Sequence, residues 1–121
     1  MRYARILVGR SLDDQIVAVL RLAAKKPWAI DAAYFSGSKR PLYLTDMAVA
    51  PTIQRCGVGR ALLLEALNVA QSWPADAIRL DAYDAPAGAG GFYARCGFEE
   101  RGRAVYRGVP LIYFERRLSM F

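Results

Sequence analysis

The chain has no histidine and only two cysteines, Cys56 and Cys96, among its 121 residues. The missing histidine excludes Ser-His-Asp and Cys-His catalysis, zinc held by imidazole, and any imidazole acid or base. The two cysteines form no CxxC pair, so two free thiols in a reducing cytosol are expected. Chemistry must therefore use tyrosine, carboxylates, lysine, backbone amides or a cofactor, and no metal site is predicted.

Long apolar runs are also missing. No stretch approaches the roughly 18 residues that a membrane helix needs, and Arg10 interrupts the apolar start before it is long enough for a signal peptide. A cytoplasmic protein without membrane contact is therefore predicted. With 55% hydrophobic and 23% charged residues, the composition is typical of one globular domain over residues 1–121.

Acidic residues are fewer than basic ones. The chain has 11 Asp and Glu residues and 17 Lys and Arg residues, which gives a formal charge of +6. This excess favours an anionic ligand or partner. Because the basic residues are scattered, they are weak evidence for a nucleic-acid surface, and a phosphate-rich small molecule explains them as well. Nucleic acid is the less favoured partner.

The hydrophobic pattern changes period along the chain. Apolar residues recur at helical spacing from Val58 to Trp73, and Pro74 ends that pattern. The expected strands are residues 4–9, 15–22, 42–49, 78–83, 98–105 and 110–118; the expected helices are 59–73 and 86–97; and residues 30–35 are a short strand or a turn. Strand, helix and strand over 42–83 form a βαβ unit with parallel strands. The predicted fold is α/β, with a mixed, mostly antiparallel sheet and one central βαβ crossover.

The turn between the strand at 42–49 and the long helix has the features of a phosphate site. A helix start leaves about four N–H groups free and carries about half a positive charge. Gly57 and Gly59 would let an anion approach those groups closely. Arg55 and Arg60 make sense there if a phosphate group lies between them, although a glycine-rich turn with solvated arginines is the structural alternative. The P-loop and dinucleotide motifs fit poorly, because neither Gly-Lys-Ser/Thr nor a third glycine is present.

Two motifs resemble the GNAT family of N-acetyltransferases. Gln54, Gly57 and Gly59 match its Gln/Arg-x-x-Gly-x-Gly/Ala signature, after a strand end at residues 47–51 that looks like Leu-x-Val-x-Pro. Further on, residues 93–98 match the family's Tyr-x-x-x-Gly-Phe. The two motifs stand in the family's order on a strand–helix–strand–helix frame, and the resemblance runs from about residue 6 to the C-terminus.

The resemblance implies an N-acetyltransferase that moves an acetyl group from acetyl-CoA to a primary amine by direct attack on the thioester. Acetyl-CoA would lie where the strands ending near Val49 and Tyr83 splay apart, with its pantetheine arm along strand backbone. Amides of residues 56–61 would hold the pyrophosphate, and an amide within 47–49 would polarise the thioester carbonyl and face the oxyanion. The implied cofactor-binding residues are Met47, Ala48, Val49, Gln54, Arg55, Cys56, Gly57, Val58, Gly59, Arg60 and Ala61.

The resemblance also implies that Tyr93 protonates the departing thiolate. A phenol with a reference pKa of about 10 keeps its proton at neutral pH; the alternative is a core tyrosine between two phenylalanines. For the base, Asp46 lies beside the reactive end of its strand, and Asp81 or Asp84 lies at the end of the next one. A water chain is a further alternative. Tyr93 and Asp46 are the predicted catalytic residues.

Two departures from the family concern both substrates. Pro86 stands where the family often has an asparagine that contacts the cofactor. Only 53 residues precede Gln54, too few for the usual first strand and helix pair that wall the acceptor site. The site would then be open, or covered by a second subunit in a homodimer, or the chain starts downstream of the true beginning. The acceptor would be a small-molecule or protein amine; the alternatives are aminoacyl-tRNA, as in toxin-type acetyltransferases, and a non-catalytic CoA-binding module.

Overall fold

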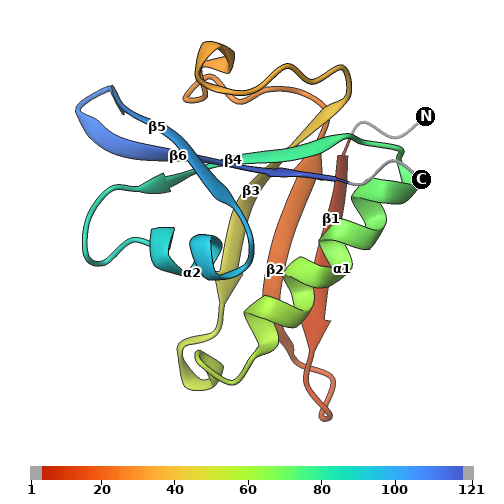
Figure 1. Ribbon diagram of the computed structural model, residues 1–121. Coiled ribbons are helices and arrows are strands. Elements are labelled where there is room, and N and C mark those ends of the chain that lie inside the picture. The colour runs from red at the N-terminus through yellow and green to blue at the C-terminus, as the bar shows by residue number, and fades with distance from the viewer. Residues whose placement is uncertain (1–3, 119–121) are drawn as a thin grey trace.

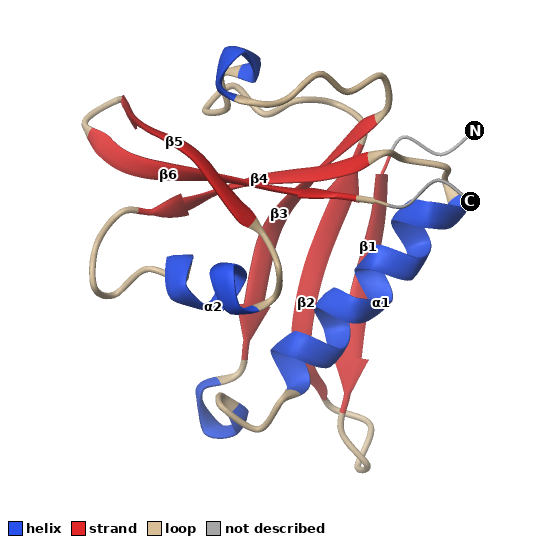
Figure 2. Cartoon of the chain, viewed as in Figure 1, coloured by secondary structure: helices blue, strands red, loops and turns tan. Residues whose placement is uncertain are grey.

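A mixed sheet with helices against one face forms the molecule in the computed structural model, which describes residues 4–118 (Figures 1 and 2). The strands are β1 Ala4–Arg10, β2 Ile16–Ala23, β3 Pro41–Val49, β4 Ala77–Tyr83, β5 Glu99–Tyr106 and β6 Val109–Arg117. The α-helices are α1 Val58–Ser72 and α2 Gly90–Arg95, and short 3-10 helices span Ala32–Tyr34 and Pro51–Ile53.

The strand order confirms the predicted fold class. Within the described residues the sheet has the order β1-β2-β3-β4-β6-β5. Only the β3–β4 pair is parallel; the other neighbours are antiparallel. Helix α1 connects the two parallel strands, as a crossover between parallel strands requires. The sheet is therefore mostly antiparallel, with one central βαβ unit.

The main hydrophobic core lies between α1 and the sheet. The apolar stripe of α1 buries Leu63, Ala66 and Ala70, spaced for one helix face. It packs on strand residues of the same cluster, among them Leu20 and Ile78. Because α1 begins at the end of β3 and is fixed by this core, its first turn is held rigidly beside the ends of the central strands.

The opposite face of the sheet carries a second, smaller cluster. Ile30 packs with Tyr43, Leu111 and Tyr113. The hydroxyl of Tyr113 donates a hydrogen bond to the carbonyl of Ala29 at 2.6 Å. These contacts hold the connection between β2 and β3 against the face that α1 does not cover.

A buried ion-pair network ties that connection to four strands, β3, β4, β5 and β6. The Glu115 carboxylate is fully buried and accepts hydrogen bonds from Arg79 Nε (2.9 Å), Arg101 Nε (3.0 Å) and Ser36 Oγ (2.6 Å). Arg79 also donates to the Tyr43 hydroxyl at 3.1 Å and to the carbonyl of Ser36 at 2.8 Å. Burial raises the pKa of Glu115, but the hydrogen bonds of Ser36 and Arg79 and the nearby guanidinium charges outweigh it and hold this pKa below its usual range.

We expect Glu115→Gln to lower the free energy of unfolding by about 3 kcal/mol, because it leaves the Arg79 guanidinium buried without its counter-charge. Since the folded-state pKa of Glu115 is depressed, its contribution is present above the ordinary glutamate pKa and is lost as the pH falls through the folded value. Urea unfolding at neutral and acidic pH measures both effects. Glu65→Gln, an exposed change on α1, is the control. Equal unfolding free energies for the two variants would contradict this role for the network.

The predicted elements are confirmed with two differences. The predicted helix start at residue 86 is wrong, because α2 begins at Gly90. Residues 85–88 form a turn in which the Gly88 N–H donates to the carbonyl of Ala85 at 2.8 Å. A Cβ on Gly88 would overlap the carbonyl oxygen of Tyr83, so this turn requires glycine. In the segment 30–35, Asp31 caps a 3-10 helix by accepting from the Ala33 N–H at 3.0 Å, and no strand forms there.

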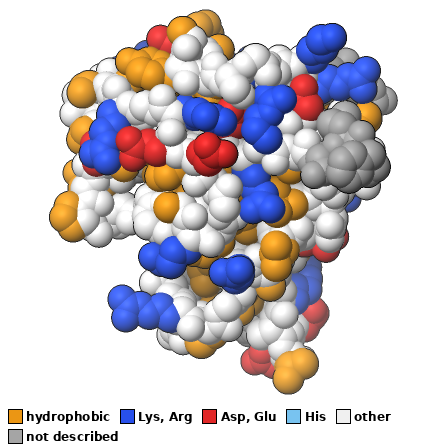
Figure 3. Space-filling view, viewed as in Figure 1, with side chains coloured by type: hydrophobic (Ala, Val, Ile, Leu, Met, Phe, Trp, Pro, Cys, Tyr) orange, Lys and Arg blue, Asp and Glu red, His pale blue; other side chains and the backbone are white. Residues whose placement is uncertain are grey.

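The surface is rich in basic side chains. Figure 3 shows more Lys and Arg than Asp and Glu on the face drawn, in line with the net charge of +6.

Between residues 4 and 118, no helix has the length and apolar character needed to cross a membrane. Localisation in the cytoplasm stays a prediction.

Candidate active site

A notch opens in the centre of the sheet because β3 and β4 pair over only part of their length. The ladder runs from Pro41↔Ala77 to Tyr43↔Arg79. Beyond it, β3 continues to Val49 and β4 to Tyr83, and the two strands diverge (Figure 1). The predicted splay of these strands is therefore confirmed.

A β-bulge shapes the β3 side of the notch. Val19 pairs with Ala48 and Arg21 with Thr45, so two residues of β3, Asp46 and Met47, oppose one residue of β2. Asp46 has a φ of 57°, in the left-handed region. A bulge of this kind re-aims the side chains that follow it. Met47 lines the cleft, whereas Asp46 is exposed and does not line it. The predicted base Asp46 is thus not brought together with Tyr93.

The backbone of Val49 has its polar groups on the notch side. The Ala50 N–H donates to the carbonyl of Val17 at 2.8 Å. Along an antiparallel ladder, the backbone N–H and C=O groups of successive residues point alternately toward and away from the neighbouring strand, so those of Val49 point away from β2. The Gln54 side chain donates to the Val49 carbonyl at 3.1 Å. This bond uses the carbonyl and leaves the N–H of Val49 facing the notch.

The turn after β3 places the start of α1 beside the notch between β3 and β4. Arg55 and Gly57 both have left-handed backbone, with φ of 68° and 82°. The Cys56 N–H donates to Ile53 at 3.3 Å, and the Ala61 N–H donates to Gly57 at 3.0 Å. Two of the predicted pyrophosphate donors, the amides of Cys56 and Ala61, are therefore already engaged. The N–H groups between Gly57 and Ala61 in the chain remain free, as at any helix start.

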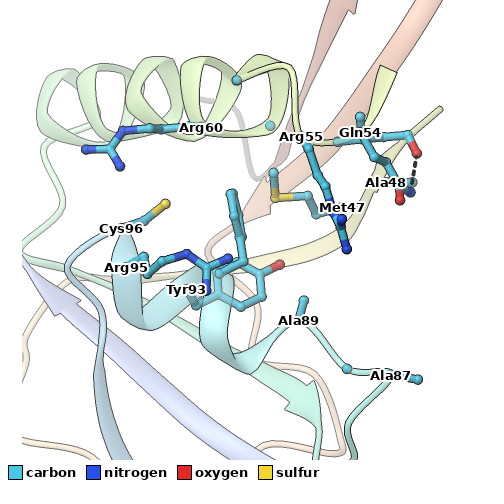
Figure 4. Close-up of a pocket in the computed structure, with 15 residues that line it drawn as sticks. Met47, Ala48, Gln54, Arg55, Arg60, Ala87, Ala89, Tyr93, Arg95 and Cys96 are labelled. Carbon is cyan, nitrogen blue, oxygen red and sulfur yellow. Dashed lines mark hydrogen bonds between the residues drawn. The ribbon is translucent and has the colours of Figure 1, made fainter. Parts of the chain in front are cut away.

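The two sequence motifs meet at one cleft of about 690 Å³ (Figure 4). It is lined by Met47, Ala48, Val49, Gln54, Arg55, Gly57, Gly59, Arg60, Ala87, Gly88, Ala89, Phe92, Tyr93, Arg95 and Cys96. Three predicted cofactor residues, Cys56, Val58 and Ala61, are not among them; Val58 packs against the core instead. The sequence reasoning missed Ala87, Gly88, Phe92 and Arg95, although Arg95 lies inside the second motif.

Tyr93 is a core tyrosine that also lines the cleft. Its side chain is 7% exposed, and its ring packs against Phe92, Phe98 and Phe114 with centroids 5.4, 5.8 and 6.1 Å away. The Tyr93 hydroxyl has no hydrogen-bond partner among the described residues. Every fully buried side-chain oxygen or nitrogen of these residues has such a partner, so the Tyr93 hydroxyl is not fully buried and reaches the cleft surface (Figure 4). Burial, followed by the charges of Asp81 and Cys96, raises the pKa of Tyr93 to about 12. The phenol therefore keeps its proton at neutral pH.

Asp81 lies where the notch begins on β4. It is two residues beyond Arg79, the last residue of β4 that pairs with β3, and it opposes Tyr113 on β6. Its neighbours Leu80 and Ala82 belong to the α1-side core, so the pleat turns Asp81 to the other face. The half-buried carboxylate has no hydrogen bond or ion pair with any described residue, and burial raises its pKa. Asp84, by contrast, is paired with Arg103 at 3.3 Å.

Comparisons with known proteins agree with this geometry. The model of the acetyltransferase (GNAT) family matches residues 2–98. Nourseothricin acetyltransferase is similar in structure, with 25% identity and a TM-score of 0.78 over 97% of this chain and 66% of that one. A chain described as a streptothricin acetyltransferase from Bacillus anthracis str. Ames, in complex with acetyl coenzyme A, has 23% identity and a TM-score of 0.77 over 98% of this chain and 65% of that one.

An acetyltransferase from Bacillus cereus ATCC 14579 is also similar, at 21% identity and a TM-score of 0.72 over 95% of this chain and 73% of that one. The chain thus spans roughly two thirds to three quarters of the length of these structures. No curated protein matches it. Because the family model covers the strand–helix–strand unit and both motifs, the chain belongs to the acetyltransferase (GNAT) family.

Proposed function

We propose that this protein is an acetyl-CoA-dependent N-acetyltransferase that acetylates a primary amine by direct attack on the thioester. One observation carries the proposal: a single cleft joins the N–H-rich start of α1 to the hydroxyl of Tyr93. The similar chain from Bacillus anthracis, which was solved with acetyl coenzyme A, supports the same cofactor.

The donor side fits acetyl-CoA in shape and charge. The free N–H groups of Val58, Gly59 and Arg60 suit a pyrophosphate at the positive end of α1. Arg55 and Arg60 line the cleft and form no ion pair with any described carboxylate. A Cβ on Gly59 would come within 3.3 Å of the Val49 side chain, so glycine keeps the helix start close to β3.

We assign three roles at the reacting end. The Val49 N–H donates a hydrogen bond to the thioester carbonyl oxygen and stabilises the negative charge that develops there. Asp81 accepts a proton from the acceptor ammonium, which makes the amine nucleophilic. The amine attacks the thioester carbon, and Tyr93 donates its proton to the sulfur as the tetrahedral adduct collapses and the carbon–sulfur bond breaks. The second proton that the nitrogen loses returns the Tyr93 phenolate to the phenol. Bound acetyl-CoA supplies the activated acyl group and the thiolate leaving group.

Neither carboxylate lines the cleft, but Asp81 replaces Asp46 as the proposed base because it is half-buried just beyond the β3–β4 ladder, whereas Asp46 is exposed. Asp81 borders the notch and its charge acts on Tyr93. Asp46 is turned outward by the bulge, and its only hydrogen-bond partner among the described residues is Thr45, at 3.4 Å. A raised pKa also brings Asp81 nearer to the range in which a general base is effective.

The acceptor is proposed to be a cationic amine of a small molecule or a protein. The unpaired carboxylate of Asp81 attracts an ammonium group on the far side of the notch. An anionic acceptor would need free cationic side chains, but Arg103 on the last hairpin is paired with Asp84 and Glu100 at 3.3 and 3.2 Å. These pairs favour an amine of a small molecule or a protein over the amine of an aminoacyl-tRNA. A homodimer that covers the acceptor site stays a prediction.

The proposed activity is tested by incubating the purified chain with acetyl-CoA and a mixture of primary amines while free thiol is measured. Thiol release that depends on both substrates is the expected result. Acetyl-CoA at a hundredfold excess over its Kd should also add about 2.7 kcal/mol to the free energy of unfolding. Stabilisation without thiol release would favour the non-catalytic CoA-binding module, and no stabilisation would contradict the proposed function.

We expect Gly57→Ala to weaken acetyl-CoA binding about tenfold, or about 1.4 kcal/mol. Gly57 has a φ of 82°, which strains an alanine and displaces the N–H groups that follow it. Gly37→Ala is the matched control, because its Cβ would meet nothing within 4 Å and its φ lies outside the left-handed region. Isothermal titration calorimetry measures both Kd values; an unchanged Kd for Gly57→Ala would contradict the assigned pyrophosphate site.

A further inference from the structure

The outer side of the edge strand β1 has no partner within the described residues. β1 pairs with β2, in an antiparallel ladder from Ala4↔Ala23 to Arg10↔Ile16, and Figure 1 shows it at the border of the sheet. No other backbone hydrogen bond of residues 4–118 involves β1. Because alternate residues of an edge strand direct their N–H and C=O groups away from the ladder, β1 presents a row of free donors and acceptors about 23 Å long.

The side chains beside this row are apolar on both faces of the sheet. Leu7 is buried in the α1-side core, so its neighbours Ile6 and Val8 point to the other face. There they are 67% and 41% exposed. On the α1 side, Val58 lies over Gly9, because a Cβ on this glycine would lie 3.7 Å from the Val58 side chain. Free backbone groups between apolar side chains are the features that bind another β-strand.

The other edge of the sheet is protected in a way that β1 is not. The register of β5 shifts after Glu100, and four of its eight residues are charged, namely Glu99, Glu100, Arg101 and Arg103. Charged side chains and bulges are common means of keeping an edge strand from pairing with another chain. β1 carries only Arg5 and Arg10 among its seven residues, and its register shifts only before the last one.

The sequence of β1 is complementary to a second copy of itself. An antiparallel pair centred on Leu7, the middle residue, aligns all seven residues of both strands. Ile6 then lies opposite Val8 of the second copy, and Val8 lies opposite the Ile6 of that copy. Such directly opposite apolar pairs stabilise an antiparallel sheet. The alignment also keeps the two α1 helices on the same face of the joined sheet.

The charges of β1 fit the same alignment. Arg5 lies opposite Gly9 of the second copy and Arg10 lies opposite its Ala4, so no arginine faces another. A shift by one residue would place Arg5 opposite Arg10 and turn the second copy to the other face. Three residues at each end of the 121-residue chain lie outside the described range, fewer than the seven of β1. The strand that pairs with β1 in this chain therefore belongs to another molecule.

We propose that two copies of this chain pair through β1, antiparallel and about a two-fold axis at Leu7, which joins their sheets into one. The contact is closed, because each copy has one free side of β1 and the pair uses both. A strand pair of this length buries less than the roughly 800 Å² per partner of a standard interface, so the dimer is reversible. β2 and β3 separate β1 from the notch, so this pairing leaves the cleft open and does not depend on the proposed function.

Sedimentation velocity of the full chain at about 1–100 µM tests the pairing. We expect a shift from monomer to dimer with rising concentration and no larger species. Ile6→Glu should raise the Kd of the dimer about tenfold, because two apolar cross-strand pairs are lost and two carboxylates come near each other. Ile6 is exposed and lies opposite Arg21 of β2, so glutamate suits the folded monomer. Val105→Glu, at a 71% exposed valine of the other edge strand, is the matched control and should leave the Kd unchanged.

A second substitution tests the alignment. Val8→Lys added to Ile6→Glu places opposite charges across the two-fold axis and should restore most of the lost affinity, whereas Val8→Lys alone should weaken the dimer. Urea unfolding of each variant shows that the monomer is folded. A wild-type chain that stays monomeric over the whole range would overturn the inference and leave the edge to another occupant. A dimer that Ile6→Glu leaves intact, or that Val105→Glu dissociates, would place the contact on another surface and overturn it equally.

Discussion

Replacement of Tyr93 by phenylalanine is expected to lower kcat about 100-fold, the smaller end of the range for loss of a positioned acid. The variant keeps the ring that packs between Phe98 and Phe114 but cannot protonate the departing thiolate. Because the hydroxyl makes no hydrogen bond to any described residue, its loss should leave the free energy of unfolding nearly unchanged. Steady-state thiol release and urea unfolding measure the two quantities.

Two features separate an acid role from a structural one. The Kd for acetyl-CoA should be unaffected in Tyr93→Phe, since the proton is needed only as the carbon–sulfur bond breaks. Tyr83→Phe, at a tyrosine that is 51% exposed and does not line the cleft, is the matched control. Because the pKa of Tyr93 is about 12, wild-type activity should not fall through ionisation of this phenol below about pH 10. An unchanged kcat in Tyr93→Phe would remove the proposed acid.

Asp81→Asn is expected to lower kcat/KM about 100-fold at neutral pH, where the acceptor amine is protonated and has to lose a proton. The deficit should shrink as the pH approaches the pKa of the amine, about 10 for a lysine-like group. In the wild type, burial raises the pKa of Asp81, so activity lost through its protonation begins at a higher pH than for an exposed aspartate. Its charge acts on Tyr93 and Tyr113, but both phenols stay neutral in this range. The measurement is a pH profile of kcat/KM for both proteins.

The same substitution has an informative effect on stability. An aspartate whose folded pKa is raised is destabilised when ionised, so its contribution to stability is greatest at low pH and is lost as the pH rises. Asp81→Asn should therefore not destabilise the chain at neutral pH, whereas a structural carboxylate would. Asp46→Asn is the comparison variant and should retain activity. The reverse outcome, with loss in Asp46→Asn and none in Asp81→Asn, would return the base to Asp46.

Features that depend on neighbours along the chain could be predicted from the sequence. The final hairpin is an example: Arg107 and Gly108 both adopt positive φ, of 50° and 81°, as a two-residue turn between these strands requires. The helix from Val58 followed from its apolar spacing, and the parallel crossover followed from strand, helix and strand in succession. Both motifs could be located because each is a short run of residue types with a local physical reason.

The helix start at Gly90 could not be predicted from local propensity. Alanine and proline at residues 85–89 suit a first helical turn. Gly88 instead packs against the carbonyl of Tyr83, and this contact holds the residues before α2 in a turn. The same limit applies to Glu115: the sequence does not reveal that it meets Arg79, Arg101 and Ser36, which come from three other segments.

The sequence by itself determined the fold class and the candidacy of the turn at residues 54–60 and of Tyr93, because each depends on residue order over a few positions. Only the tertiary structure decided which carboxylate borders the notch. Asp46 lies in the bulge of β3 and is exposed, and the β3–β4 ladder ends two residues before the half-buried Asp81. It also decided that Arg60, Arg95 and Arg116 surround one cavity, since three arginines from α1, α2 and β6 become neighbours only after the sheet and helices have packed.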